Sequence, residues 1–187
     1  PNSDSTITGI EIGSDKRAEE KSSILRTGSF RQTSQQKQLL NPDARISFEI
    51  EDRSNVKLLS EYASSKTGLQ TGDNDKYSFR FWELTGIEYP WVLFQRTAKV
   101  TSLYKGLYQV LRWENNGEKL KSQAGSSARV LDCCGKKGIL VNRMSKLPVT
   151  IYNGEIFDQN GAVLIPVNNK NIKSIWCYVS SQNYHTN

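Results

Sequence analysis

The spacing of apolar residues changes along the chain, and the first third mainly predicts helices. Residues 15–27 are typical of a helix, with Ser14 able to cap its start and Gly28 directly after its end. The residues before it are rich in Ser, Thr, Asp and Gly, so we expect a disordered lead or linker over 1–13.

Three further elements are predicted before the middle of the chain. A capping-box spacing over 33–36 predicts a short helix that must end by Asn41-Pro42. Alternation of apolar and polar residues over 46–50 predicts a strand. Apolar residues at helical spacing from 56 to 63 predict a helix that ends before Gly68.

Beyond this point short strands dominate. Segments rich in aromatic and β-branched residues are 77–84, 91–95, 107–113, 139–142, 149–152, 155–158, 163–167 and 174–179. Asn-Gly dipeptides at 116–117, 153–154 and 160–161 predict tight turns. We therefore expect an α+β fold, with N-terminal helices followed by a mostly antiparallel, twisted multi-strand sheet with loop-rich edges. The domain boundaries would be a helical connector with one strand over 14–66 and a strand-rich domain over 67–187.

The distribution of charge differs between the two halves of the chain. The chain has 187 residues, 36% of them hydrophobic, and a net charge of +6. Residues 1–90 hold 12 Lys/Arg against 14 Asp/Glu, whereas residues 91–187 hold 13 against 5. This asymmetry predicts a surface in the second half that binds a polyanion, although a merely basic, solvated surface is an equal alternative.

Other counts weaken several classes of function. The three cysteines include the adjacent Cys133 and Cys134 and form neither a disulfide framework nor a zinc-binding spacing. A single histidine, His185, leaves a self-contained hydrolase without a convincing catalytic set. No spanning or signal segment is recognisable, so we expect a cytoplasmic protein without a membrane partner. The chain begins at Pro1, and we expect it to be a fragment.

The segment Thr67-Gly-Leu-Gln-Thr-Gly-Asp-Asn-Asp75 is the densest in polar chemistry. Its glycines allow close approach of a partner, and its side chains supply donors and acceptors suited to base edges, sugars or phosphates. The expected contacts are Gln70, Thr71, Asp73, Asn74 and Asp75. An ordinary polar loop is the alternative. The segment fits neither a calcium-binding EF-hand nor a P-loop.

A second group interleaves basic and aromatic residues between 96 and 146. Lysine and arginine neutralise phosphates, and arginine also reads guanine in the major groove. The expected DNA contacts are Arg96, Lys99, Lys105, Lys121, Arg129, Lys136, Lys137, Arg143 and Lys146. Trp113, within the same group, is expected in the core.

Several segments together resemble a known family. Gly68-Leu-Gln-Thr-Gly-Asp-Asn-Asp-Lys-Tyr77, followed by Phe81-Trp82-Glu83, resembles the start of the target recognition domain in large adenine-N6 DNA methyltransferases. These include fused type II restriction–modification enzymes and methyltransferases of BREX phage-defence systems. Also similar are Leu25-Arg-Thr-Gly-Ser-Phe-Arg, Gln38-x-x-Asn41-Pro-Asp-Ala-Arg-Ile46, Arg112-Trp-Glu-Asn-Asn-Gly-Glu-Lys-Leu120 and Glu155-Ile-Phe-Asp-Gln-Asn-Gly161.

The chain also departs from the family. Lys76, Tyr77 and Ser78 replace the usual Arg and Phe-Leu pair, and the aromatic, glycine-rich run before residue 155 is short. Neither the Phe-x-Gly-x-Gly cofactor motif nor Asn-Pro-Pro-Tyr/Phe is present, and Asn41-Pro42-Asp43 matches only the start of the latter. No convincing nuclease pattern is recognisable.

The resemblance implies sequence-specific binding of double-stranded DNA. Residues 67–187 would form the target recognition domain, and 14–66 would connect it to a missing catalytic domain of the same polypeptide. The chain itself would hold no cofactor, and S-adenosylmethionine would bind in that catalytic domain. The alternative is a protein–protein interaction or scaffold domain of a defence complex, with the basic surface binding an acidic partner.

Overall fold

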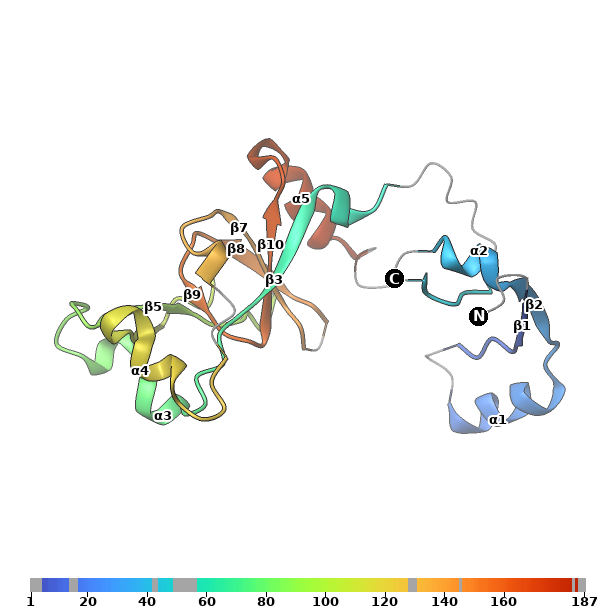
Figure 1. Cartoon of the computed structure of the whole chain (residues 1–187), viewed down its shortest axis with the longest axis horizontal. Helices are drawn as coiled ribbons and strands as arrows, with labels where there is room; N and C mark the ends of the chain where they lie inside the picture. The colour runs from blue at the N-terminus through green and yellow to red at the C-terminus, as the bar shows by residue number, and fades with distance from the viewer. Residues whose placement is uncertain are drawn as a thin grey trace. The chain divides into compact units, whose positions relative to one another are not determined.

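The computed structural model describes residues 5–13, 17–41, 44–48, 57–127, 131–144, 146–182 and 184. The chain divides into two compact units, residues 1–56 and residues 57–187, and each is described by itself (Figure 1). Helices and antiparallel, open sheets occur together, which confirms the expected α+β class.

The first unit is a two-stranded sheet with two helices. Strand β1 (Thr6–Gly9) pairs antiparallel with β2 (Arg31–Ser34). The expectation of a disordered lead over 1–13 is therefore wrong for β1, because its backbone groups are paired with a strand that the composition alone does not reveal.

The helices of the first unit lie close to their predicted positions. Helix α1 (Ala18–Thr27) follows Arg17, and the expected cap Ser14 lies outside the described residues. Helix α2 (Gln35–Leu39) is capped by Ser34, whose hydroxyl accepts a hydrogen bond from the Lys37 backbone N–H. The strand expected over 46–50 is wrong for residues 46–48, which are irregular, and residues 49–50 lie outside the described residues.

The second unit contains two four-stranded sheets instead of the single sheet that was expected. In the first sheet, all neighbours pair antiparallel in the order β3-β10-β7-β8. Its strands are β3 (Ala63–Thr67), β7 (Gly138–Asn142), β8 (Val149–Tyr152) and β10 (Gly161–Pro166).

The second sheet has the order β4-β6-β5-β9. Its strands are β4 (Ser78–Arg80), β5 (Trp91–Gln95), β6 (Gln109–Arg112) and β9 (Ile156–Phe157). Strands β4, β6 and β5 pair antiparallel, whereas β9 pairs parallel with β5. Strands β8 and β9 therefore lie in different sheets, and the Asn153-Gly154 turn between them does not close a hairpin.

Strands β7, β8 and β10 of the first sheet are buried on both faces, and their alternating side chains face two different clusters. Leu140 and Val163 belong to a core cluster shared with the second sheet. Ile139 and Leu164, their neighbours in sequence, face a second cluster that includes residues of helix α5 (Ile172–Val179). Helix α5 thus covers one face and the second sheet covers the other.

Two predicted elements of the second unit have a different type of secondary structure. Residues 174–179 belong to α5 and not to a strand, since Ile172, Ile175 and Val179 follow the helical period. The helix expected over 56–67 is instead a short 3₁₀ helix (Leu59–Glu61) followed by β3. Only Ala63 of β3 is buried, so these residues have no apolar helix face to bury. Pairing with β10 therefore determines the extended conformation of β3.

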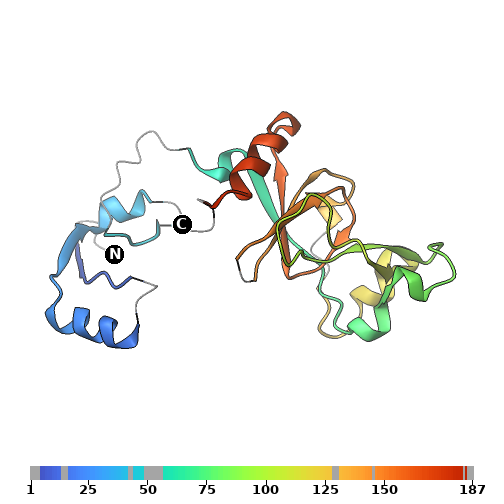
Figure 2. The same cartoon turned by 180° about the vertical axis from the view of Figure 1, so that it is seen from behind.

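Short helices interrupt the strands at the other end of this unit. Helix α3 (Asn74–Tyr77) precedes β4, and 3₁₀ helix Phe81–Glu83 follows it, where a continuous strand over 77–84 was expected. Helix α4 (Glu118–Lys121) follows a turn at Glu114–Gly117. Opposite views show α3 (green) and α4 (yellow) together, away from α5 (red) (Figures 1 and 2). The remaining 3₁₀ helices are Leu131–Cys133 and Asn169–Asn171.

Candidate nucleic-acid interface

The loop over 68–74 lies directly against the turn over 158–160, although about ninety residues separate them in sequence. The Leu69 N–H donates to the Phe157 carbonyl at 2.7 Å, and the Leu69 carbonyl accepts from the Gln159 N–H at 3.0 Å. A Cβ on Gly68 would overlap with the backbone of Asp158 and Phe157. The close approach therefore requires glycine at this position.

The opposite side of the loop contacts the segment that follows α4. Gln70 and Ser127 exchange both backbone hydrogen bonds, at 3.0 and 2.9 Å. Gly72 has a φ of +75°, and a Cβ there would lie 2.6 Å from the Ala124 carbonyl oxygen. Backbone contacts thus hold the loop on both sides.

Three of the expected base contacts stabilise the loop. Thr71 is buried, and its hydroxyl donates to the side-chain oxygen of Asn74 at 2.9 Å. The Asp73 carboxylate caps α3 by accepting from the Lys76 N–H at 3.1 Å. Intramolecular hydrogen bonds therefore use the Thr71 hydroxyl hydrogen and one carboxylate oxygen of Asp73, and the expected DNA contacts of these two residues stay predictions. Asp75 is exposed on α3.

The loop and the turn together enclose a polar hollow of about 160 Å³, which we call the amide hollow. It is lined by Leu69, Gln70, Thr71, Gly72, Asn74, Asp158, Gln159 and Asn160. The side-chain amides of Gln70, Gln159 and Asn160 are exposed and have no hydrogen-bond partner among the described residues. Each therefore offers one acceptor and two donor hydrogens to a ligand.

An ion pair stabilises the turn beneath this hollow. Arg96 Nη1 lies 2.7 Å from Asp158 Oδ2, and the Asp158 side chain is only 6% exposed. The other carboxylate oxygen accepts from the Asn160 N–H at 2.8 Å. Arg96 was expected to contact phosphate, and the structure pairs its charge with Asp158, so a phosphate contact would have to compete with this ion pair.

Two further cationic residues come close to the turn through their backbone. The Arg143 N–H donates to the Asn160 carbonyl at 2.8 Å. The Asn142 side chain donates to the Ala98 carbonyl at 2.9 Å, which brings the neighbouring Lys99 to the same end of β7. Both Lys99 and Arg143 are exposed.

The remaining expected cations do not all lie with these residues. Lys136 and Lys137 precede β7, whereas Arg143 follows it, and a five-residue strand spans roughly 16 Å. Lys146 is exposed in the connection from β7 to β8. The other two described cations are Lys105, beside Thr150, and Lys121, whose ammonium lies 5.4 Å from the Trp113 ring. Arg129 lies outside the described residues.

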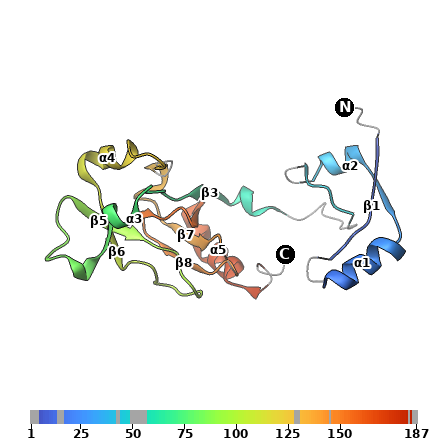
Figure 3. The ribbon, with the colours of Figure 1, turned by 90° about the horizontal axis from the view of Figure 1, so that it is seen from below.

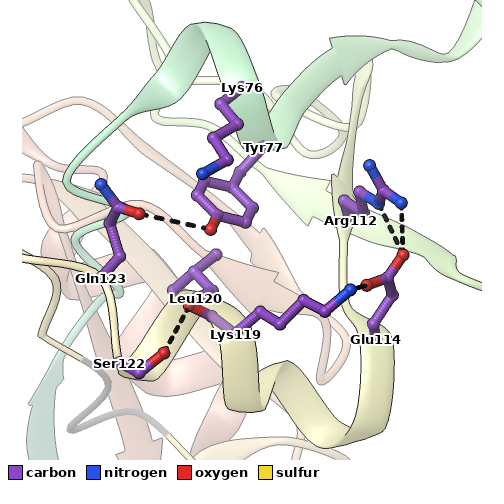
Figure 4. A pocket seen from close by; sticks show the side chains of 8 residues that line it. All are labelled: Lys76, Tyr77, Arg112, Glu114, Lys119, Leu120, Ser122 and Gln123. Carbon is purple, nitrogen blue, oxygen red and sulfur yellow. Dashed lines mark hydrogen bonds and ion pairs between the residues drawn. The ribbon is translucent and has the colours of Figure 1, made fainter.

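A second and larger depression of about 400 Å³ lies between α3 and α4 (Figure 4). We call it the cation pocket, and it is lined by Lys76, Tyr77, Arg112, Glu114, Lys119, Leu120, Ser122 and Gln123. Arg112 and Lys119 belong to the basic and aromatic group between 96 and 146, although neither was named among the individual expected DNA contacts, and Lys76 lies outside that group. Figure 3, seen from below, shows α3 and α4 beside β5 and β6 at this end of the unit.

A turn that the sequence partly revealed brings two of these cations together. Asn115, Asn116 and Gly117 all have positive φ, so the chain reverses direction between Arg112 and Lys119. A Cβ on Gly117 would overlap with the Trp113 ring, which is half-buried against the core. The Asn-Gly dipeptide therefore indicates a turn correctly, but this turn leads into α4 and not into a second strand.

The adjacent thiols of Cys133 and Cys134 are poorly suited to nucleophilic chemistry. Burial raises the pKa of both Cys133 and Cys134, which favours the protonated form at neutral pH. Burial also raises the pKa of the Tyr152 hydroxyl, which donates to the Glu155 carbonyl at 2.7 Å. Among the described residues, no group of His, Cys, Asp or Glu could hold a metal ion. Similarly, no described helix has the length and apolar character needed to cross a bilayer.

No protein-family model matches the chain, and no curated protein matches it significantly. The interpretation of the interface therefore depends on its geometry and on the resemblance of its two central segments.

Proposed function

We propose that the chain is a sequence-specific recognition module for duplex DNA, belonging to an adenine-N6 DNA methyltransferase of a restriction–modification or phage-defence system. Methyl transfer from S-adenosylmethionine would be performed by a catalytic domain outside this chain. The module would supply base contacts and position the duplex for that domain.

The amide hollow is the observation that carries this proposal. Its two walls are the segments 68–77 and 155–161, which resemble separate parts of the same family of recognition domains. Gln70, Gln159 and Asn160 all line the hollow, and their side-chain amides are exposed. Asparagine and glutamine amides recognise adenine by a bidentate hydrogen bond in the major groove, so the lining suits an adenine-containing site.

The charges near the hollow support contact with the DNA backbone. Lys99, Arg143 and Lys146 are exposed at the end of β7 that adjoins the turn over 158–160. Phosphate contacts of this kind give affinity and orientation, whereas amide contacts give sequence preference. Lys136 and Lys137, which precede β7, are not part of the proposed contact.

Fluorescence anisotropy with the full chain and a mixed-sequence duplex tests the proposal. We expect binding at low salt, and we expect its affinity to fall steeply with salt because each phosphate contact releases a counterion. Changing both Lys99 and Arg143 to Glu should weaken binding about tenfold or more and lower the salt dependence. The matched control changes Lys170 and Lys173, near and on α5, to Glu and should have a much smaller effect.

Two outcomes would overturn the proposal. One is the absence of DNA binding even at low salt, and the other is binding that does not depend on salt. Absence of DNA binding together with specific binding of an acidic protein would instead favour the scaffold function.

A further inference from the structure

The cation pocket shares no lining residue with the amide hollow, and its chemistry is different. Arg112 Nε donates to Glu114 Oε1 at 2.8 Å, while Lys119 Nζ lies 2.7 Å from Glu114 Oε2 (Figure 4). The carboxylate of Glu114 is therefore held between a guanidinium and an ammonium group. Hydrogen bonds from Lys119 and Arg112 lower the pKa of Glu114, so it is ionised at neutral pH.

The pocket remains cationic after this pairing. Lys76 also lines it, with its ammonium 5.2 Å from the Tyr77 ring centroid and no carboxylate partner among the described residues. Three cationic side chains and one carboxylate give the lining a net charge of +2. The side chains of Arg112 and Lys119 are 49% and 71% exposed, so a ligand from solvent can reach both.

The rest of the lining suits a larger ligand than a simple anion. Tyr77 and Leu120 are buried and form an apolar floor. Ser122 and Gln123 add a hydroxyl and an amide at the rim, and the Tyr77 hydroxyl lies 3.5 Å from Gln123 Oε1. A volume of about 400 Å³ falls within the usual range of small-molecule sites, about 300–1,000 Å³.

We infer that the cation pocket binds a nucleotide, with its phosphate on Arg112 and Lys119 and its nucleoside against Tyr77 and Leu120. Glu114 occupies the phosphate position in the unliganded chain and keeps the two cations in place. A phosphate group brings more acceptor oxygens and can recruit Lys76 as well, so it displaces the carboxylate. The nucleotide is either free or part of a DNA strand.

Isothermal titration calorimetry with deoxyadenosine monophosphate tests the free form. Arg112→Gln and Lys119→Gln should each weaken binding about tenfold or more, because each removes a charge-assisted hydrogen bond. Lys121→Gln, on the same helix but outside the pocket, should leave the affinity unchanged. Glu114→Gln should tighten binding about fivefold by removing the competing carboxylate, whereas Glu118→Gln should not.

Two other probes identify the ligand class. Inorganic phosphate should bind more weakly than the nucleotide, and equal affinities would overturn the assignment of the nucleoside. A polyglutamate peptide that binds more tightly than the nucleotide would also overturn it, in favour of an acidic protein partner. Circular dichroism of each variant should show an unchanged fold, because the substituted side chains are on the surface.

Parallel measurements with duplex DNA separate this inference from the proposed function. If Arg112→Gln weakens binding of both the nucleotide and DNA, the pocket holds a nucleotide of the bound strand. If only nucleotide binding is weakened, the pocket takes a free nucleotide. The inference would be overturned if all pocket variants bound the nucleotide as tightly as the wild type does, or if the wild type did not bind the nucleotide at all. Either result would count even if DNA binds well. Nucleotide binding without any DNA binding would support it while overturning the proposed function.

Discussion

The amide hollow and the cation pocket are built by different forces, although both lie beside the segment that follows α4. Backbone hydrogen bonds from Leu69 and Gln70 and a glycine without room for a Cβ hold the walls of the amide hollow. The cation pocket is held by ion pairs between the half-buried side chain of Glu114 and the exposed side chains of Arg112 and Lys119. One site is therefore fixed by the fold, and the other by groups that can exchange partners.

This difference suits the two sites to different parts of ligand binding. Hydrogen bonds to base edges lose strength within a fraction of an ångström, so a rigid backbone frame favours discrimination. Coulomb attraction falls slowly with distance, so flexible cations still give affinity. Substitutions in the hollow should change stability and sequence preference, whereas substitutions in the pocket should change affinity alone.

Gly68→Ala should give the largest effect and would show how rigidly the hollow is built. The added Cβ would overlap with backbone atoms of Asp158 and Phe157, which cannot move without breaking the contact between loop and turn. We expect a loss of about 3 kcal/mol or more in the free energy of unfolding, measured in urea.

Gly86→Ala is the matched control for this change. No atom lies within 4 Å of a Cβ built on Gly86, so we expect a change within about 0.5 kcal/mol. Equal stability of the two variants would mean that the loop moves away from the turn easily, and the proposed rigidity would be lost.

The sequence predicted the positions of the strands better than it predicted which strands pair with one another. Strands β5 and β8 have the predicted bounds, because aromatic and β-branched residues favour extended structure in any sheet. The parallel pairing of β5 with β9 joins segments about sixty residues apart, and no local pattern indicates it. The ion pair of Arg96 with Asp158 depends on this pairing, so the sequence did not indicate that the charge of Arg96 has a partner within the chain.

The candidate sites show the same limit. The loop over 68–74 was recognisable from its dense polar composition, but its contact with the turn over 158–160 is tertiary. The cation pocket was missed because it requires α3 and α4 to lie together, and neither short helix has an apolar period that a sequence reveals. Arg112 and Lys119 were consequently recognised only as members of a long basic and aromatic group, and Lys76 only as part of the segment that resembles the family.

Gln159→Ala should give an intermediate effect and tests whether the hollow discriminates between bases. A bidentate contact from an amide to adenine contributes about 1–3 kcal/mol of discrimination. The wild-type chain first selects a preferred duplex from a random-sequence pool. For the variant, we expect the ratio of its affinity for this duplex to its affinity for a random competitor to fall about tenfold. Gln36→Ala, an exposed glutamine on α2 in the first unit, serves as the control. If the wild-type chain selects no sequence, the hollow does not read bases.

Glu114→Gln should give the smallest effect on stability. It tests most directly whether the cation pocket, unlike the amide hollow, contributes little to the stability of the fold. Its carboxylate pairs with Arg112 and Lys119 at the surface, where solvent screens the attraction and the side chains lose entropy when they pair. We expect the urea midpoint of Glu114→Gln to match that of Glu118→Gln, which removes the same charge from the nearby helix α4. Only Glu114→Gln should tighten nucleotide binding. A midpoint well below that of Glu118→Gln would mean that the ion pairs hold α4 against β6. The cation pocket would then be part of the structural frame, as the amide hollow is, and its cations would not be available to exchange a carboxylate for a phosphate.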